Sequence, residues 1–214
     1  MTSSIDPHAD QPVTLAGLPL DVSGRAVVMI HGRNAAPRNI LDLMPRLDRP
    51  RFSYVAPAAA NNTWYPFSFL EPVAKNEPDL TSALKRLERV LLDIATAGVP
   101  ARRTVLLGFS QGACLAAEFA YRHAERFGGV VLFSGGLIGP PGTTWQTNRS
   151  FQRTAIFLGC SNVDAHVPEQ RVNETADVFL RMDADVTKRI YPGMGHLVCD
   201  DEIAAAQALL DGLE

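Results

Sequence analysis

The sequence predicts a single α/β domain, residues 1–214, in which helices cover both faces of a mostly parallel sheet. Apolar runs of strand length alternate with helix-forming segments. The runs are apolar throughout rather than at every second residue, as in strands buried on both faces. A chain of 214 residues with 46% hydrophobic side chains can bury such a core without disulfides or metals.

The chain begins with a polar, turn-rich segment, residues 1–24, whose first ten residues we expect to be flexible. Residues 25–30 and 52–55 are mostly apolar and predict two buried strands. Between residues 58 and 78 no element is predicted, and this stretch is expected to be a long loop.

A helix is predicted from Asp79, where apolar residues recur at helical spacing until Gly98 ends the run. Its apolar face consists of Leu80, Leu84, Leu87, Leu91 and Ile94. Residues 105–107 then predict a strand, and residues 113–121 predict the helix that follows it.

The second half of the chain repeats the alternation. Residues 129–133 predict a buried strand, and residues 154–158 and 185–190 predict two further strands. One helix follows Pro168, and another begins at Asp200, where acidic residues suit a helix N-terminus. The apolar faces of these helices are Val172, Ala176, Phe179 and Leu180 in the first, and Ile203, Ala206, Leu210 and Leu213 in the second.

A serine lies where a predicted strand is followed directly by a predicted helix. The motif Gly108-Phe109-Ser110-Gln111-Gly112 connects a strand directly to a helix, which is the context that a G-x-S-x-G nucleophile elbow requires. Such a turn strains the backbone of Ser110 and exposes its hydroxyl at the carboxyl end of the sheet. The Gln111 amide, at the helix N-terminus, points to where an oxyanion would form. If Ser110 were only a helix N-cap, both glycines would be unexplained.

A serine nucleophile needs a base, and the base needs an acid that fixes its tautomer. In this arrangement both partners follow the serine, each in a loop just after a later strand. Asp164 follows the strand at 154–158, and His196 follows the strand at 185–190, so both lie at the same end of the sheet as Ser110. The sequence therefore predicts catalytic roles for Ser110, Asp164 and His196.

Other side chains compete for these roles. His166 is the main rival of His196, but it lies two residues from Asp164, and such close neighbours rarely orient each other. His31 is expected to brace the loop that follows it, and His8 falls in the flexible start. The competing carboxylates precede a strand or begin a helix, namely Asp183, Asp185, Asp200 and Asp201.

Three motifs in this order resemble the phospholipase/carboxylesterase family of α/β-hydrolases, which includes the acyl-protein thioesterases. They are Gly108-Phe109-Ser110-Gln111-Gly112, Asp164 with Val167-Pro168, and Gly193-Met194-Gly195-His196. The resemblance extends from about residue 25 to the C-terminus. It implies the α/β-hydrolase fold and a serine hydrolase for carboxylic esters or thioesters, with no cofactor and no metal. The compact chain predicts a minimal lid or none.

The family pattern also implies which amides hold the oxyanion, namely those of Gln111 and of Arg33, the residue after His31-Gly32. This chain departs from the family here. It reads Arg33-Asn34-Ala35-Ala36, where another small or apolar residue and a further glycine are usual. The backbone donor survives this change, and the Arg33 side chain adds a positive charge near the pocket mouth. The resemblance further implies a possible homodimer.

An aromatic loop, residues 64–70, reads Trp-Tyr-Pro-Phe-Ser-Phe-Leu. Two explanations stay open, since it could be a satellite hydrophobic cluster or one wall of an acyl or aromatic pocket. Trp64 and Phe69 are its pocket candidates. Met194, two residues before His196, is likewise either a pocket contact or a packing residue.

Charge and cysteine content narrow the partners and the location. A net charge of −3 gives no electrostatic footprint for nucleic acid, and no apolar run has membrane-spanning length. We therefore expect neither nucleic-acid binding nor stable membrane insertion. Cys114, Cys160 and Cys199 lack metal spacing and indicate free thiols in a reducing compartment. Since no signal-peptide pattern is visible at the start, a cytoplasmic location is expected.

We expect a serine esterase that forms an acyl-enzyme with small or medium-chain esters. An alternative on the same residues is a thioesterase or lysophospholipase that acts on acyl-protein or lipid substrates. A third hypothesis is a non-catalytic α/β-hydrolase that binds a small ligand. Such proteins usually lose a triad residue, whereas this chain has all three candidates.

Overall fold

A computed structural model describes residues 6–213, which form a seven-stranded sheet in the order β1-β3-β2-β4-β5-β6-β7. The strands are β1 (Val13–Gly17), β2 (Ala26–Ile30), β3 (Ser53–Pro57), β4 (Thr104–Phe109), β5 (Gly129–Phe133), β6 (Ala155–Ser161) and β7 (Asp185–Tyr191). Only β1 pairs antiparallel, with β3, and the other neighbours are parallel. The expected mostly parallel α/β fold is confirmed.

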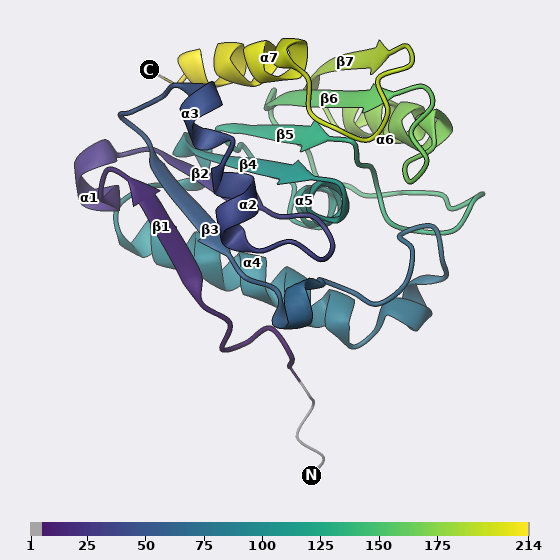
Figure 1. Cartoon of the computed structure of the whole chain (residues 1–214), viewed down its shortest axis with the longest axis horizontal. Helices are drawn as coiled ribbons and strands as arrows, with labels where there is room; N and C mark the ends of the chain where they lie inside the picture. Colours follow the sequence, from purple (N-terminus) through teal and green to yellow (C-terminus); the bar gives the residue numbers. More distant parts are fainter. Residues whose placement is uncertain (1–5, 214) are drawn as a thin grey trace.

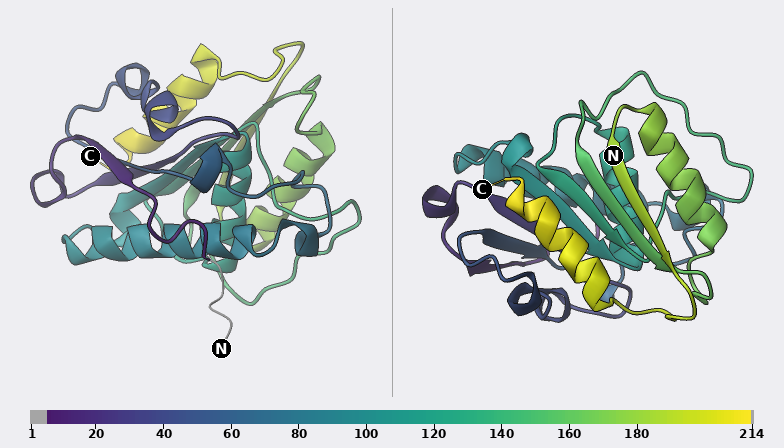
Figure 2. Two further views of the ribbon diagram at one scale, coloured as in Figure 1. Left: turned by 60° about the horizontal axis from the view of Figure 1, so that its bottom comes forward. Right: turned by 90° about the horizontal axis from the view of Figure 1, so that it is seen from above.

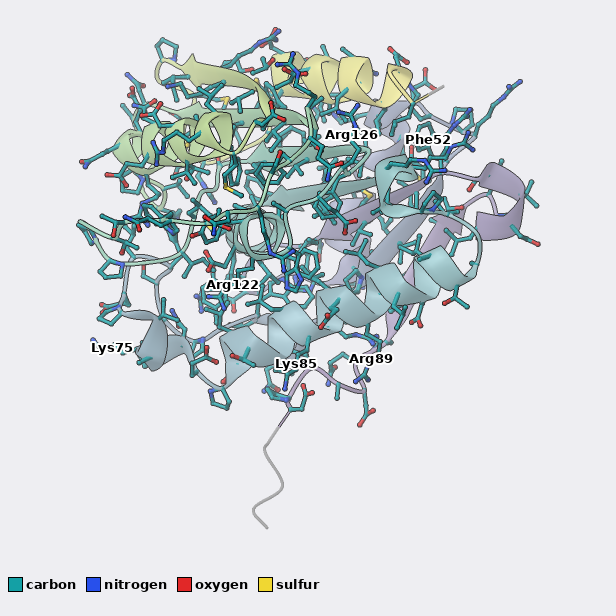
Figure 3. The ribbon with its side chains drawn as sticks, turned by 180° about the vertical axis from the view of Figure 1, so that it is seen from behind. Phe52, Lys75, Lys85, Arg89, Arg122 and Arg126 are labelled. Atoms are coloured by element: carbon teal, nitrogen blue, oxygen red, sulfur yellow. The ribbon has the colours of Figure 1, made fainter. Side chains whose placement is uncertain are left out.

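Helices cover both faces of this sheet (Figures 1 and 2). They are α1 (Leu20–Ser23), α2 (Pro37–Leu41), α3 (Met44–Leu47), α4 (Asp79–Thr96), α5 (Gln111–Arg122), α6 (Glu169–Arg181) and α7 (Asp200–Asp211). The core on one face includes side chains of α4, α5 and α6, and the core on the other face includes side chains of α2, α3 and α7. The longest helix, α4, turns Lys85 and Arg89 away from the sheet (Figure 3).

The apolar faces predicted for the helices agree with this packing, with one exception. Four of the five residues predicted for the apolar face of α4 are buried, and Leu91 is half-buried. Of the face predicted for α7, three residues are buried, and Leu213 is half-buried just beyond the end of the helix. In α6, Val172, Ala176 and Phe179 are buried, but Leu180 is 54% exposed. The assignment of Leu180 to the buried face is wrong, because it follows Phe179 directly and lies about 100° further around the helix.

The N-terminal segment is more ordered than expected within the described residues. His8 is fully buried, and its backbone N–H donates to Ser82 Oγ on α4 at 2.9 Å. Its ring accepts from the Ala60 amide at 3.0 Å and donates to the Trp64 carbonyl at 2.9 Å. The expectation of flexibility is therefore wrong for residues 6–10, whereas residues 1–5 lie outside the described part. The segment then continues into β1, which was not predicted.

The parallel strands β2 to β7 end at one edge of the sheet, where the loops that follow them meet. Two long connections leave this edge, residues 58–78 and residues 134–154. In the first of these the structure has only the short 3-10 turns Ala60–Asn62 and Val73–Asn76, and in the second it has no helix. This agrees with the expectation of a minimal lid. No helix in the described chain is long and apolar enough to cross a membrane.

Candidate active site

The turn between β4 and α5 brings two chain segments unusually close together. Ser110 has φ 55° and ψ −121°, a left-handed conformation that costs free energy for a residue with a side chain. A Cβ on Gly108 would lie 2.4 Å from the Gly112 carbonyl oxygen, and one on Gly112 would lie 2.1 Å from that of Ile30. Both glycines of the motif are therefore required sterically, and the predicted strained elbow is present.

His196 lies between Ser110 and Asp164. Its Nε2 is 2.9 Å from Ser110 Oγ, and its Nδ1 is 2.7 Å from Asp164 Oδ2. Because a carboxylate only accepts hydrogen bonds, Nδ1 carries the ring hydrogen, and Nε2 is left to accept from the serine hydroxyl. The three residues predicted from the sequence are thus brought into one hydrogen-bonded chain.

The loops that carry Asp164 and His196 are bonded to each other. They follow the paired strands β6 and β7, whose last paired residues are Ser161 and Tyr191. Beyond the strands, the Gly195 amide donates to Ser161 Oγ at 3.1 Å, and the Gly193 amide donates to Asn162 Oδ1 at 2.9 Å. These bonds extend the strand pairing and fix the position of the histidine loop.

The Asp164 carboxylate is fully buried and is held from both sides. Oδ1 accepts from the backbone amides of His166 at 2.8 Å and Val167 at 3.0 Å, and Oδ2 accepts from His196. Burial raises the pKa of Asp164, but these hydrogen bonds outweigh it and hold the pKa below its ordinary value. Asp164 is therefore ionised at neutral pH, as a group that stabilises an imidazolium must be.

His166, the rival candidate, lies against His196 rather than in its place. The two rings meet edge-on with centroids 4.8 Å apart, and His166 lines the cleft beside Ser110. Its contact with Asp164 is made by the backbone amide, not by the ring. The geometry therefore favours His196 as the partner of Ser110.

The loop after β2, which contains Gly32 and Arg33, lies beside the elbow serine. A Cβ on Gly32 would lie 3.5 Å from Ser110 Cβ, so this loop passes directly beside the serine. Neither the Arg33 nor the Gln111 backbone N–H donates to a protein acceptor within the described chain. Two free amides beside a serine hydroxyl form a possible oxyanion hole.

His31 braces this loop, as expected. Its Nε2 accepts from the Ala59 amide at 3.2 Å, so its Nδ1 carries the hydrogen and donates to the Gly32 carbonyl at 2.8 Å. Burial lowers the pKa of His31 below its ordinary value, which keeps the ring neutral and this bonding pattern intact.

The side chains of Gln111 and Arg33 bind the backbone of the aromatic loop. Gln111 accepts from the Trp64 amide at 3.0 Å and donates to the Tyr65 carbonyl at 2.8 Å. Arg33 donates to the carbonyls of Pro66 and Phe67, both at 2.7 Å. Four consecutive residues of the aromatic loop are thus bonded to the two residues that supply the free amides.

A cleft of about 900 Å³ opens at the Ser110 hydroxyl. Phe69 lines this cleft, as expected if the aromatic loop forms one wall of a pocket. Tyr65 and Phe67, from the same loop, line it too, whereas sequence reasoning did not identify three other apolar lining residues, namely Ile40, Phe109 and Val167. The Phe109 ring lies 4.9 Å from that of His196, and its place beside the elbow serine was the one available sequence signal.

Two pocket candidates do not line the cleft within the described structure. Trp64 is fully buried, and its indole Nε1 donates to the His31 carbonyl at 2.9 Å. Met194 is half-buried outside the lining residues. The pocket hypothesis is therefore wrong for Trp64, whose indole is bonded to His31, and Met194 is not among the residues that line the cleft.

Burial also determines the chemistry of the cysteines nearest the site. All three cysteines are free, and burial raises the pKa of both Cys114 and Cys160 to about 12. Both thiols are therefore protonated at neutral pH and are poor nucleophiles. In the described chain, no cluster of three or more His, Cys, Asp or Glu side chains could hold a metal ion.

Comparisons with known proteins identify the family and the fold of this chain. The sequence model of the Phospholipase/Carboxylesterase family matches residues 21–213. A phospholipase/carboxylesterase from Dyadobacter fermentans is 36% identical, with a TM-score of 0.91 over 97% of this chain and 99% of that chain. A Bacillus cereus carboxylesterase shares the fold, with a TM-score of 0.77 and 19% identity over 96% of each chain.

A curated relative matches a smaller part of its length. An acyl-protein thioesterase 1 from Debaryomyces hansenii is 27% identical over 150 residues, which are 68% of this chain and 64% of that protein. This chain thus spans a little less than two thirds of that relative. The family match, in contrast, extends from α1 to the end of the described residues. On this basis the chain belongs to the phospholipase/carboxylesterase family of α/β-hydrolases, a family of ester-hydrolysing enzymes.

Proposed function

We propose that this chain hydrolyses carboxylic esters with Ser110 as nucleophile, His196 as general base and acid, and Asp164 as the acid that orients it. The observation that carries the proposal is the hydrogen-bonded chain from Ser110 Oγ to His196 and on to Asp164, at 2.9 and 2.7 Å. Family membership supports the reaction class, and the cleft at the serine gives an ester access.

In the first half of the reaction, Ser110 Oγ attacks the carbonyl carbon while His196 Nε2 takes the hydroxyl proton. The negative charge that develops on the carbonyl oxygen is bound by the amides of Arg33 and Gln111. The intermediate then collapses, the alcohol leaves with the proton from His196, and the acyl group stays on Ser110. In the second half, water repeats the attack and the acid is released.

The expected substrates are small or medium-chain esters, because the cleft is open and the long loops around it lack a helical lid. A thioesterase acting on acylated proteins is a second candidate. The apolar side chains that line the cleft favour it, among them Ile40, Phe69 and Phe109, since an acyl chain would pack against them. The relative named acyl-protein thioesterase 1 adds support.

The test is a series of p-nitrophenyl esters from acetate to palmitate, with kcat/KM measured for each. Ser110→Ala should lower kcat by roughly 10⁴–10⁶. Ser150→Ala, in the loop before β6, is the matched control and should leave it unchanged. A maximum at long chains, together with turnover of an S-palmitoylated peptide, would favour the thioesterase. Activity that survives in Ser110→Ala would refute the proposed nucleophile.

A further inference from the structure

Arg33 carries a positive charge at the rim of the cleft, in a fixed position. Its guanidinium donates to the Pro66 and Phe67 carbonyls and lies 5.8 Å from the centre of the Tyr65 ring. A guanidinium has five N–H groups, and these two bonds use two of them, so three remain. The side chain is exposed and lines the cleft, which makes these donors accessible from the substrate side.

No acidic side chain neutralises this charge within the described structure. The residues that line the cleft include Arg33 and three histidines but no aspartate or glutamate. Arg33 also has no carboxylate partner among the described ion pairs, which occupy the arginines at positions 46, 49, 122, 153, 171 and 189. The chain as a whole has a net charge of −3, whereas Arg33, which lines the cleft, is positive.

We propose that Arg33 is a specificity residue that binds a carboxylate of the substrate, and that the preferred substrates are esters bearing such a group. The inference rests on the proposed ester hydrolysis and adds a substrate class to it. A guanidinium is planar and matches a carboxylate with paired N–H donors, and holding it in place beforehand reduces the entropy lost on binding.

The position of Arg33 also limits the distance between the carboxylate and the scissile ester. The backbone N–H of Arg33 is one of the two amides proposed to bind the oxyanion. One residue would therefore bind the reacting carbonyl with its backbone and the carboxylate with its side chain. A short spacer of a few bonds would connect the two groups. Two sources share this chemistry, namely half-esters of short dicarboxylic acids and esters whose alcohol is a short hydroxy acid.

The test compares each anionic ester with a neutral ester of the same shape, and base uptake in a pH-stat gives kcat/KM. Ethyl hydrogen glutarate is paired with the analogue in which an isopropyl group replaces the carboxylate. Glycolate butyrate is paired with isobutyl butyrate. We expect the anionic member of at least one pair to react about tenfold faster at low salt, as for a hydrogen-bonded charge pair. The ratio should fall as salt is added.

Three variants separate recognition from support of the aromatic loop. Arg33→Met should bring the anionic-to-neutral ratio to about one or below, and Arg33→Lys should retain part of the preference because it keeps the charge. Arg38→Met removes an exposed arginine outside the cleft and is the matched control, which should retain the full ratio. Thermal denaturation of each variant checks that it is folded.

The outcomes distinguish the two proposals. If Arg33→Met slows the anionic and the neutral ester equally, Arg33 only supports the aromatic loop, and carboxylate recognition is refuted. Equal rates for both members of each pair in the wild-type protein refute it as well. If no ester shows hydrolysis that depends on Ser110, the esterase proposal itself fails. If the anionic member reacts faster only in the glutarate pair, the recognised carboxylate lies in the acyl part, and if only in the glycolate pair, it lies in the alcohol part.

Discussion

Replacing Trp64 by phenylalanine tests whether this side chain supports the site from behind or contacts substrate. The indole is fully buried and donates to the His31 carbonyl, a bond that phenylalanine cannot form. Leaving this buried carbonyl without its donor should cost about 1–3 kcal/mol. The smaller ring would leave a cavity of roughly 40 Å³, which adds about 1 kcal/mol. We therefore expect the free energy of unfolding to fall by about 2–4 kcal/mol.

In a protein of this size, such a loss lowers the melting temperature by roughly 5–15 °C. Calorimetry would measure this shift, and the ester series would measure chain-length preference in parallel. Because Trp64 does not line the cleft, the rank order of the esters should stay the same. Phe69→Leu is the matched comparison, since Phe69 lines the cleft and its truncation should shift the rank order towards longer or bulkier acyl groups. An unchanged melting temperature with a shifted rank order in Trp64→Phe would refute the reasoning.

Three further predictions concern buried groups. Glu202 is fully buried, and burial is the main cause that raises its pKa from 4.5 to about 7. The folded state therefore loses stability as the pH increases between these two values. Glu202→Gln should melt like the wild-type protein near pH 5 but be more stable at pH 8, by up to about 3 kcal/mol; a less stable variant at pH 8 would contradict this. Gly112→Ala should destabilise the protein by more than about 4 kcal/mol, because the new Cβ would lie 2.1 Å from the Ile30 carbonyl oxygen. Gly142→Ala has open space and should cost only about 1 kcal/mol for its backbone conformation, so similar melting temperatures for the two would refute the steric argument. Asp164→Asn should lower kcat by about 10⁴ while the protein stays folded, because the amide favours the wrong tautomer of the base; a loss of less than tenfold would argue against its assigned role.

The buried strands could be predicted from the sequence because each is apolar along its whole length. β1 was missed for the opposite reason. It is an edge strand whose five residues are half-buried or exposed, so its sequence lacks the apolar run that identifies β2 to β6. His8 was placed wrongly because its burial depends on Ala60, Trp64 and Ser82, which are more than 50 residues away in the sequence.

The residues of the hydrogen-bonded chain could be proposed because their positions follow from topology. Parallel strands end at one edge, so a residue just after β6 and one just after β7 come close to a residue just after β4. The cleft wall was less predictable. Trp64 and Phe69 lie in one loop with similar side chains, and Trp64 is buried through hydrogen bonds to Gln111 and His31 that no local pattern reveals.

The bonds that hold the aromatic loop have a consequence for protein engineering. The hydrogen bonds that the Gln111 and Arg33 side chains form with the loop involve only its main-chain atoms: one amide and three carbonyls. These hydrogen bonds therefore do not depend on which side chains of the loop line the cleft. Phe67 and Phe69 could be randomised in a library while the loop's anchoring is retained. Substrate range can diversify here without rebuilding the catalytic apparatus, so this loop is a natural starting point for directed evolution.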